Sequence, residues 1–367
     1  MKLKIWSAFL VASLVLAACG DGDDGVDEPV DEPEETVEEE GEDDASEDDV
    51  AEDDASEDEA AEEEAAGDDR ADWPDSIVFT LTPSQEQGGL IETAEPLAEL
   101  LAAELGVEVE ALVPTDYAGV IVALESGQAD VAGGLGPRQM VQAEEQAGAE
   151  LILQSERFGD FSYVTQWMTN DPDTFCGDEP VDVDGYLYCN GVSEAGGPGD
   201  GPIGDEYLAE IAGQTVSFVD QGSTSGYAVP ALQLLNAGVD PIDGIDSFFA
   251  GGHDNSVLSV YNGDAVVGTS YNDARGDVAE QAEDVGQEVV VFAWSAAIPN
   301  DGFAVRGDLP DSLQEAITDA FLAIADSEDG IALLNELYNI DGLNPVNSGE
   351  FDTIRQLEQE LGERLDG

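Results

Sequence analysis

The stretch Val219-Asp220-Gln221-Gly222-Ser223-Thr224-Ser225-Gly226-Tyr227 marks the point where a predicted strand passes into a predicted helix. Residues 214–219 have strand composition, and apolar residues recur at helical spacing over 227–235. At such a junction the first N–H groups of the helix are free, the positive end of the helix dipole points outward, and three hydroxyls add donors. The stretch therefore predicts either an oxyanion site or a plain N-cap, for which Ser and Thr are the usual residues.

Strand-like and helix-like segments alternate through the first part of the body with short connections. Strands are expected at 77–84, 107–114 and 130–135, and helices at 93–105 and 118–126. This alternation predicts an α/β fold, in which a parallel sheet is covered by helices on both faces.

An internal similarity links two parts of the chain. A shift of 136 residues aligns Tyr117 with His253 and Gly127 with Gly263, so that 117–131 and 253–267 share an aromatic entry, a helix, a Gly stop and a strand. The comparison predicts two similar lobes; a chance likeness of two loop-helix-strand units is the alternative. Equivalent loops would then meet at the carboxyl ends of the strands, where open α/β sheets bind ligands.

The N-terminus has the pattern of an export signal over residues 1–18. Lys2 and Lys4 precede an apolar run that is too short to span a membrane and ends at small residues. The ending Leu16-Ala17-Ala18-Cys19 resembles the lipobox of bacterial lipoproteins, which implies cleavage before Cys19 and lipidation of its sulfur. An ordinary secretory signal with an incidental Cys is the alternative. The predicted mature chain is extracytoplasmic and reaches the cell membrane through a lipid anchor only.

Residues 19–75 are expected to form an acidic, disordered linker. From Asp21 to Asp72 there are 30 Asp and Glu residues and one basic residue, Arg70. Such a segment repels itself and cannot bury a core. A calcium-binding tail is the alternative, although no calcium-loop spacing is present.

The body from Trp73 to Gly367 contains six Arg, no Lys and 55 acidic residues. A body with this excess of acids, and with enough apolar residues for a normal core, indicates a high-salt habitat. There the Debye length falls to roughly 3 Å at 1 M salt and self-repulsion is tolerable. The charge disfavours nucleic acid as a partner.

Cys176 and Cys189 flank residues 177–188 within an insertion rich in Gly, Asp and Pro that runs from Cys176 to Pro202. Outside the cell two cysteines this close are expected to form a disulfide. Two free thiols are the alternative, and a metal site lacks further Cys or His nearby.

Several motifs together resemble one protein family over about Ile77 to Arg355. They are Thr115-Asp116-Tyr117-Ala118, the strand that follows Gly127 and ends at Gly136-Pro137, Gly222 to Pro230, Gly251-Gly252-His253-Asp254, Tyr271-Asn272-Asp273 and Ile298-Pro299-Asn300-Asp301. In this order they are similar to the phosphate/phosphite/phosphonate-binding proteins of ABC transporters, the PhnD-like solute-binding family.

The resemblance implies a two-lobed type II periplasmic-binding-protein fold with a cleft between lobes that close by a hinge motion. Lobe one is expected at 76–163 and 296–367 and lobe two at 164–295, with crossings near 162–166 and 294–299. The family's ligand residues fall here on Tyr117, Ser223, Thr224, Ser225, His253 and Asp273, with Tyr163 as a weaker candidate.

The roles implied for these residues suit a tetrahedral oxyanion. The Ser-Thr-Ser turn would hold it, Tyr117 and His253 would donate, and Asp273 would accept from a ligand that carries a proton or an amine. This set encircles an anion without a formal positive charge. Arg138 departs from the family pattern; it is either half of a surface ion pair or a second anchor at the rim of the cleft.

The function implied is a lipid-anchored, monomeric receptor that delivers phosphate, phosphite or a phosphonate to an ABC permease and ATPase, with no cofactor, metal or catalysis. An enzyme is disfavoured because the register does not fit a nucleophile elbow and Ser225 has no evident base except His253. Two other functions stay open: a ligand sensor of the same fold, and a ferric-ion or carboxylate binder that uses Tyr117, His253 and Asp273.

Overall fold

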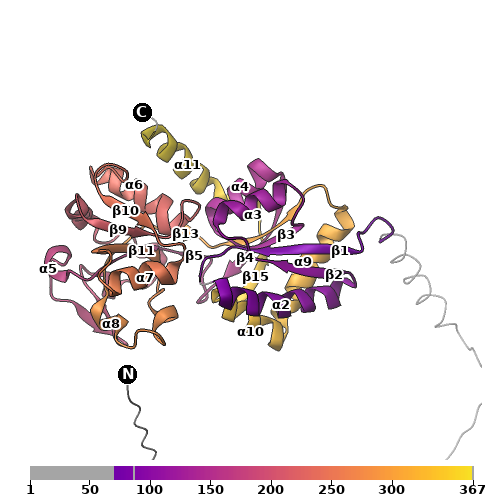
Figure 1. The fold of residues 1–367 in the computed structure, drawn as a ribbon, viewed down its shortest axis with the longest axis horizontal. Coiled ribbons are helices and arrows are strands. Elements are labelled where there is room, and N and C mark those ends of the chain that lie inside the picture. The colour runs from indigo at the N-terminus through magenta and orange to yellow at the C-terminus, as the bar shows by residue number, and fades with distance from the viewer. Residues whose placement is uncertain (1–69, 86, 366–367) are drawn as a thin grey trace, which may run out of the picture. The chain divides into compact units, whose positions relative to one another are not determined.

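The structure, a computed structural model, describes residues 70–85 and 87–365. The predicted signal peptide, the lipidation of Cys19 and nearly all of the predicted linker lie outside these residues. None of the helices among these residues combines the length and the hydrophobicity of a membrane-spanning segment. The described chain forms two α/β lobes, each built on its own mixed sheet (Figure 1), and the expected two-lobed fold is confirmed.

The first sheet is built mainly from the N-terminal third of the body and is completed by strands from the C-terminal part. In spatial order its strands are β15 (Gly342–Pro345), β4 (Ala149–Glu156), β14 (Gly302–Arg306), β3 (Val131–Leu135), β1 (Ser76–Leu81) and β2 (Glu108–Leu112). Strands β2, β1 and β3 are parallel, as predicted. Strands β14, β4 and β15 are antiparallel to their neighbours, because β14 re-enters the sheet after the chain has passed through the second lobe.

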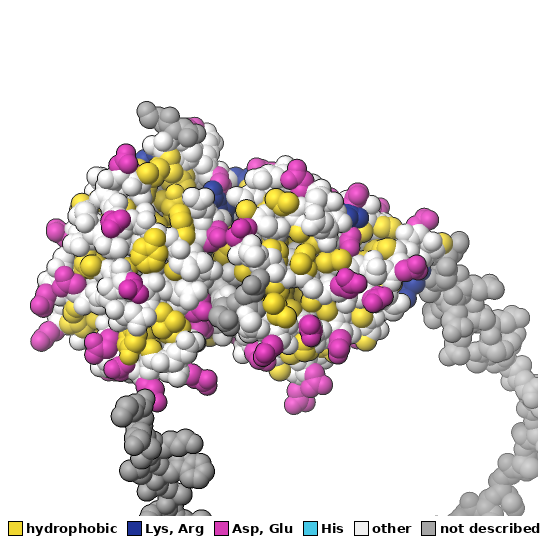
Figure 2. All heavy atoms as spheres, viewed as in Figure 1, with side chains coloured by type: hydrophobic (Ala, Val, Ile, Leu, Met, Phe, Trp, Pro, Cys, Tyr) yellow, Lys and Arg dark blue, Asp and Glu magenta, His cyan; other side chains and the backbone are white. Residues whose placement is uncertain are grey.

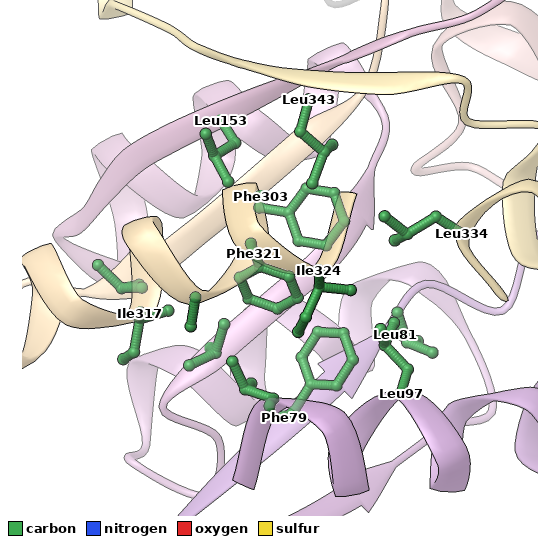
Figure 3. Packing of buried hydrophobic residues seen from close by; sticks show 14 of the residues in the cluster. Phe79, Leu81, Leu97, Leu153, Phe303, Ile317, Phe321, Ile324, Leu334 and Leu343 are labelled. Atoms are coloured by element: carbon green, nitrogen blue, oxygen red, sulfur yellow. The ribbon is translucent and has the colours of Figure 1, made fainter. Parts of the chain in front are cut away.

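Helices cover both faces of this sheet (Figure 1). They are α2 (Gln87–Leu105), α9 (Asp311–Asp326) and α10 (Glu328–Tyr338) on one face, and α3 (Tyr117–Glu125) and α4 (Pro137–Ala147) on the other. Helix α2 begins six residues before the predicted start, since the Gly-rich segment ahead of Thr93 continues the helix. Phe321 of α9 packs against Phe79 and Phe303 of the sheet with tilted rings, at centroid separations of 5.5 and 4.8 Å respectively (Figure 3).

The second sheet comes from the middle of the chain. Its strands, in spatial order, are β10 (Asp246–Phe249), β9 (Thr215–Phe218), β11 (Val267–Tyr271), β6 (Thr165–Thr169), β12 (Val290–Trp294), β8 (Tyr186–Tyr188) and β7 (Val181–Val183). Its principal helices are α6 (Val229–Asn236) and α7 (His253–Tyr261). The segment between β9 and α6 is the π-helical turn η4 (Thr224–Ala228), so the predicted helix begins with an irregular turn.

The chain crosses between the lobes at a small antiparallel pair, β5 (Ser162–Tyr163) with β13 (Ile298–Pro299). Both strands lie inside the segments in which crossings were expected. The lobe limits 76–163 with 296–367, and 164–295, stay a prediction. The last helix, α11 (Asp352–Leu365), contacts α4 of the first lobe and α6 of the second.

The internal similarity corresponds to equivalent elements. Tyr117 and His253 are the first residues of α3 and α7, which are nine residues long each. Gly127 and Gly263 follow these helices with left-handed φ values of 68° and 77°, which glycine adopts without a Cβ penalty. The same shift of 136 residues relates the bounds of β3 to those of β11.

The insertion carries the predicted disulfide and extends the second sheet. Cys176 and Cys189 are bonded, with their Cα atoms 5.7 Å apart. Hairpin β7–β8 follows Cys176 and pairs with β12 through Tyr188. The insertion is therefore an integral edge of the second lobe.

Candidate ligand-binding site

A cavity of about 40 Å³ lies where the two lobes meet. Its lining comes from strand ends and helix starts of both lobes: Ser84, Gln85, Tyr117, Gly134, Gly136, Arg157, Tyr163, Ser223, Thr224, Ser225, His253, Tyr271, Asp301 and Tyr338. A cavity holds one water per roughly 10–15 Å³ of such volume. It therefore accommodates about three water-sized atoms, on the scale of the oxygens of a small tetrahedral anion.

The predicted Ser-Thr-Ser turn, called the serine-threonine turn below, forms one wall of this cavity. Ser223, Thr224 and Ser225 are each 2% exposed. Ser223 is the N-cap, and its Oγ accepts a hydrogen bond from the Gly226 N–H at 3.0 Å. The cap interpretation is thus correct for Ser223, and it does not exclude a ligand because the hydroxyl can still donate its own proton.

The turn packs directly against the other lobe. A Cβ added to Gly222 would lie 2.7 Å from Cβ of Tyr117, so only glycine allows this approach. The Arg138 N–H donates to Thr224 Oγ1 at 2.9 Å, and the His253 N–H donates to the carbonyl of Ser84 at 2.8 Å. These hydrogen bonds join the lobes around the cavity.

Four tyrosines surround the cavity: Tyr117, Tyr163, Tyr271 and Tyr338. Burial raises the pKa of each, to about 12 for Tyr163 and well above the usual value for Tyr117. All four are neutral hydroxyls at physiological pH and can donate. The Tyr338 hydroxyl donates to the Thr82 carbonyl at 2.7 Å, and the Tyr271 hydroxyl donates to Asp277. The pKa rise caused by burial is partly opposed by Ser223 at Tyr117 and by Ser225 at Tyr163, both residues of the serine-threonine turn.

His253 is a neutral imidazole inside this cavity. It is 4% exposed, and its Nδ1 lies 2.8 Å from Ser270 Oγ. Burial lowers its pKa to about 3, and the nearby charge of Arg157 contributes in the same direction. The ring therefore offers hydrogen bonds without a formal charge, as the expectation for this residue requires.

An ion pair that was not predicted from the sequence also lines the cavity. Arg157 Nη2 lies 2.9 Å from Asp301 Oδ1, and the two side chains are 15% and 7% exposed. Burial raises the pKa of Asp301, and Arg157 opposes this shift. The cavity therefore does contain a formal positive charge, contrary to expectation. Two features of the sequence could have pointed to this ion pair: Arg is scarce in the body, and Asp301 ends the Ile298 to Asp301 motif.

A tight two-residue turn fixes Arg157. Its N–H and that of Asp160 each donate to the other residue's carbonyl at 3.0 Å. Phe158 and Gly159 at the tip have φ values of 53° and 75°, the left-handed pair that a hairpin turn of this length needs. The guanidinium is thus presented from a rigid backbone.

The structure does not bring Asp273 into the cavity lining. Its carboxylate accepts from Arg275 Nε at 3.0 Å, from Gln166 Nε2 at 2.9 Å and from the Tyr188 hydroxyl at 2.8 Å. Burial alone would raise the pKa of Asp273, but Arg275 holds it below the ordinary value. Arg275 is completely buried, with the ring of Tyr186 4.9 Å from its guanidinium. The Asp273 carboxylate, which was expected to accept a hydrogen bond from the ligand, therefore bonds to residues inside lobe two.

Arg138 is likewise absent from the lining. Its guanidinium forms an ion pair with Glu358 of α11 and donates to the carbonyl of Gln221. The ion-pair alternative fits this geometry better than the anchor. Arg138 joins α4, the segment before the serine-threonine turn and the C-terminal helix.

No group of three or more His, Cys, Asp or Glu residues that could hold a metal ion occurs in the described ranges 70–85 and 87–365. The three metal ligands considered from the sequence do not converge, because Asp273 is held by Arg275 and Tyr188. What does converge is a set of hydroxyl donors, a neutral His and one paired guanidinium.

The chain is similar to known substrate-binding proteins. Residues 79–351 match the family described as "ABC transporter, phosphonate, periplasmic substrate-binding protein". The chain is 25% identical over 301 residues to the phosphate-import protein PhnD of Mycolicibacterium smegmatis. This match covers 78% of this chain and 85% of the relative. It is 22% identical over 271 residues to the phosphonates-binding periplasmic protein of Escherichia coli, covering 71% of this chain and 69% of that one.

Two solved structures share the fold. A binding-protein component of an ABC phosphonate transporter from Pseudomonas aeruginosa superposes with a TM-score of 0.65 at 21% identity, covering 78% of this chain and 86% of that one. A Prochlorococcus marinus protein solved in complex with methylphosphonate superposes with a TM-score of 0.63 at 17% identity, covering 80% of this chain and 99% of that one.

Proposed function

This chain belongs to the family of periplasmic substrate-binding proteins of phosphonate ABC transporters, and on that premise we propose that it captures phosphate, phosphite or a small phosphonate in the cavity between its lobes. Proteins of this family work outside the cytoplasm with a permease and an ATPase, and are not enzymes. The proposal adds the ligand, the residues that hold it and the closing of the lobes.

The observation that carries the proposal is the donor set of the cavity. Ser223, Thr224, Ser225, Tyr117 and Tyr163 place neutral hydroxyls around a space of about 40 Å³. Hydrogen bonds from hydroxyls to a charged acceptor are roughly twice as strong as those between neutral groups. In a protein this acidic, such short-range bonds have to supply the affinity, because long-range attraction does not favour an anion.

The ion pair of Arg157 with Asp301 sets the charge of the cavity. With His253 neutral, the pair makes the lining neutral overall, so an incoming anion meets a donor cation and an acceptor carboxylate side by side. Asp301 can accept a hydrogen bond only from a ligand oxygen that carries a proton. We therefore assign to Asp301 the filtering role that the sequence suggested for Asp273.

Access to this cavity requires the lobes to separate. The hydrogen bonds from Arg138 to Thr224, from His253 to Ser84 and from Gln85 to Tyr271 span the lobes around the cavity. Ligand entry would break these bonds, and closure over the ligand would restore them, with β5 and β13 as the connecting segments.

We also propose the oligomeric state, the membrane anchor and the environment of the receptor. It is a monomer tethered through Cys19, with the acidic segment as a spacer, in a high-salt environment. Acidic side chains spread over the face of the body shown in Figure 2, with few Arg among them. Metabolic labelling with a radioactive fatty acid would test the anchor: wild-type chain incorporates label and Cys19→Ala does not, whereas equal labelling of both would contradict it.

Calorimetric titration at high salt tests the ligand. Phosphate, phosphite, methylphosphonate and 2-aminoethylphosphonate are compared with sulfate, and we expect submillimolar binding of at least one phosphorus oxyanion. Ser225→Ala should weaken that binding at least tenfold. Ser259→Ala is the matched control, because Ser259 Oγ only donates to the Asn255 carbonyl of its own helix, outside the cavity. Binding of sulfate alone, or an equal loss in both variants, would refute the proposal.

A further inference from the structure

A second cavity, of about 260 Å³, lies beside the first cavity, in which we place the oxyanion. The two share Arg157, Tyr163 and Tyr271 in their linings, so one begins where the other ends. The small cavity has room for about three water-sized atoms, whereas the larger has several times that space. A ligand whose oxyanion group fills the first cavity can therefore extend a substituent into the second.

Both lobes wall this second cavity. The turn that carries Arg157 and residue Asn339 come from the first lobe, and Asn272 comes from the second. The remaining wall is Gly196-Gly197-Pro198, part of the insertion that follows the disulfide.

This wall is held in place on both sides. The Gly196 N–H donates to Asp200 at 2.7 Å within the loop. Beyond the loop, Ile203 pairs with Trp294, through N–H to carbonyl distances of 3.1 and 2.9 Å. The insertion therefore forms a fixed boundary.

The polar groups of the second cavity favour a substituent that bears oxygen. Among the described residues, Arg157 Nε is buried without a hydrogen-bond partner. Asn272 Oδ1 already accepts from the Val164 N–H at 3.0 Å, which leaves its NH2 group as a donor. The one carboxylate in the lining, Asp160, belongs to an exposed residue and accepts from the N–H and the hydroxyl of Ser162 at the same oxygen, Oδ1. Two donors, Arg157 Nε and the Asn272 NH2 group, thus stand against one free carboxylate oxygen, Asp160 Oδ2.

We propose that this second cavity is a subsite for the organic substituent of the ligand, and that it selects organophosphorus anions whose substituent carries a carboxylate or hydroxyl oxygen. The inference rests on the proposed function, since it requires the oxyanion group to occupy the first cavity. It assigns to the insertion a direct part in ligand selection.

Two glycines of the insertion allow a matched test. Gly197 lines the second cavity, and a Cβ added there meets no atom within 4 Å, so Gly197→Trp places a large side chain at this wall without a clash at Cβ. Gly199 is equally open and belongs to the same loop, but it does not line the cavity. Gly199→Trp is therefore the control.

The probes are methylphosphonate, propylphosphonate and 3-phosphonopropionate, titrated calorimetrically into the full-length protein and both variants. In the wild type, 3-phosphonopropionate should bind at least tenfold more tightly than propylphosphonate. Gly197→Trp should remove this advantage and leave methylphosphonate binding within about twofold, which also reports an intact fold. Gly199→Trp should change neither.

The outcomes separate the two proposals. If methylphosphonate binds but 3-phosphonopropionate gains nothing over propylphosphonate, or if Gly197→Trp behaves as Gly199→Trp does, the subsite is refuted and the proposed function stands. If none of the three phosphonates binds and inorganic phosphate and phosphite also fail, the proposed function is refuted and the subsite with it.

Discussion

Replacing Arg157 with Gln would leave the Asp301 carboxylate buried without its ion-pair partner. Asp301 is 7% exposed and Arg157 15%, and their charged atoms lie 2.9 Å apart. Removing one partner of a buried pair typically costs 3–5 kcal/mol. Because Arg157 retains some contact with solvent, we expect the lower end, about 3 kcal/mol of unfolding free energy. The carboxylate can relieve part of this cost by taking up a proton, so the loss should shrink below neutral pH.

Urea unfolding at high salt, followed by tryptophan fluorescence, measures this loss. Arg157→Gln and Asp301→Asn should each destabilise the protein, and the double variant should recover part of the loss because no unpaired charge remains. Arg364→Gln is the control: this arginine lies in the last turn of α11 and bonds to Asn236 at the surface, so its loss should stay within about 0.5 kcal/mol.

The same variant should weaken oxyanion binding. A hydrogen bond to a charged group contributes roughly 1.5–3 kcal/mol, which corresponds to about 10- to 150-fold in affinity. Calorimetric titration at urea concentrations below those that unfold the variant measures this loss of affinity. A loss of stability under about 1 kcal/mol, combined with unchanged affinity, would mean that Arg157 and Asp301 behave as a surface pair and that the reasoning is wrong.

Three further predictions use the same unfolding assay. The pKa of His253 is about 3 in the folded state and 6.5 in the unfolded state. Between these pH values the unfolded state binds a proton that the folded state does not bind. Stability is thus lost as pH falls through this window, and wild type should lose about 1 kcal/mol more than His253→Gln between pH 8 and pH 5.5; parallel curves would contradict this. Replacing Cys176 and Cys189 together by Ser should cost about 3 kcal/mol, from a sequence separation of 13 residues; an unchanged midpoint would show that the reduced loop is already constrained. Because the body carries 55 acids against six Arg, the midpoint should rise between 0.15 and 2 M NaCl; a flat or falling dependence would exclude charge repulsion as the dominant salt effect.

Local patterns predicted the elements around the site. The strand before Ser223 and the helix after it follow from composition and spacing, and the structure shows β9, η4 and α6 there. The shift of 136 residues found Tyr117 and His253 as equivalent helix starts, and both line the cavity. These predictions succeed because each depends on residues close together in the chain.

The acceptor in the site could not be predicted in this way. Asp273 was expected to face the ligand, but Arg275, two residues later, and Tyr188 of the insertion draw it into lobe two. Asp301, to which we assign the acceptor role, is paired with Arg157, which lies 144 positions earlier in the chain. Asp301 does stand in the Ile298 to Asp301 motif, but nothing in the sequence pairs it, among 55 acidic residues of the body, with an arginine so far along the chain.

Residue patterns predict the two α/β lobes, the disulfide of the insertion and the serine-threonine turn, since periodicity, chain proximity and capping chemistry act over a few residues. The charge and the extent of the cavity follow from contacts that exist only in the folded chain. Arg157, Asp301 and the loop at Gly197 meet because β5 and β13 bring the lobes together and the insertion folds back against β12. Contacts between such distant segments depend on sheet order and on the crossings between lobes, which residue patterns along the chain do not encode.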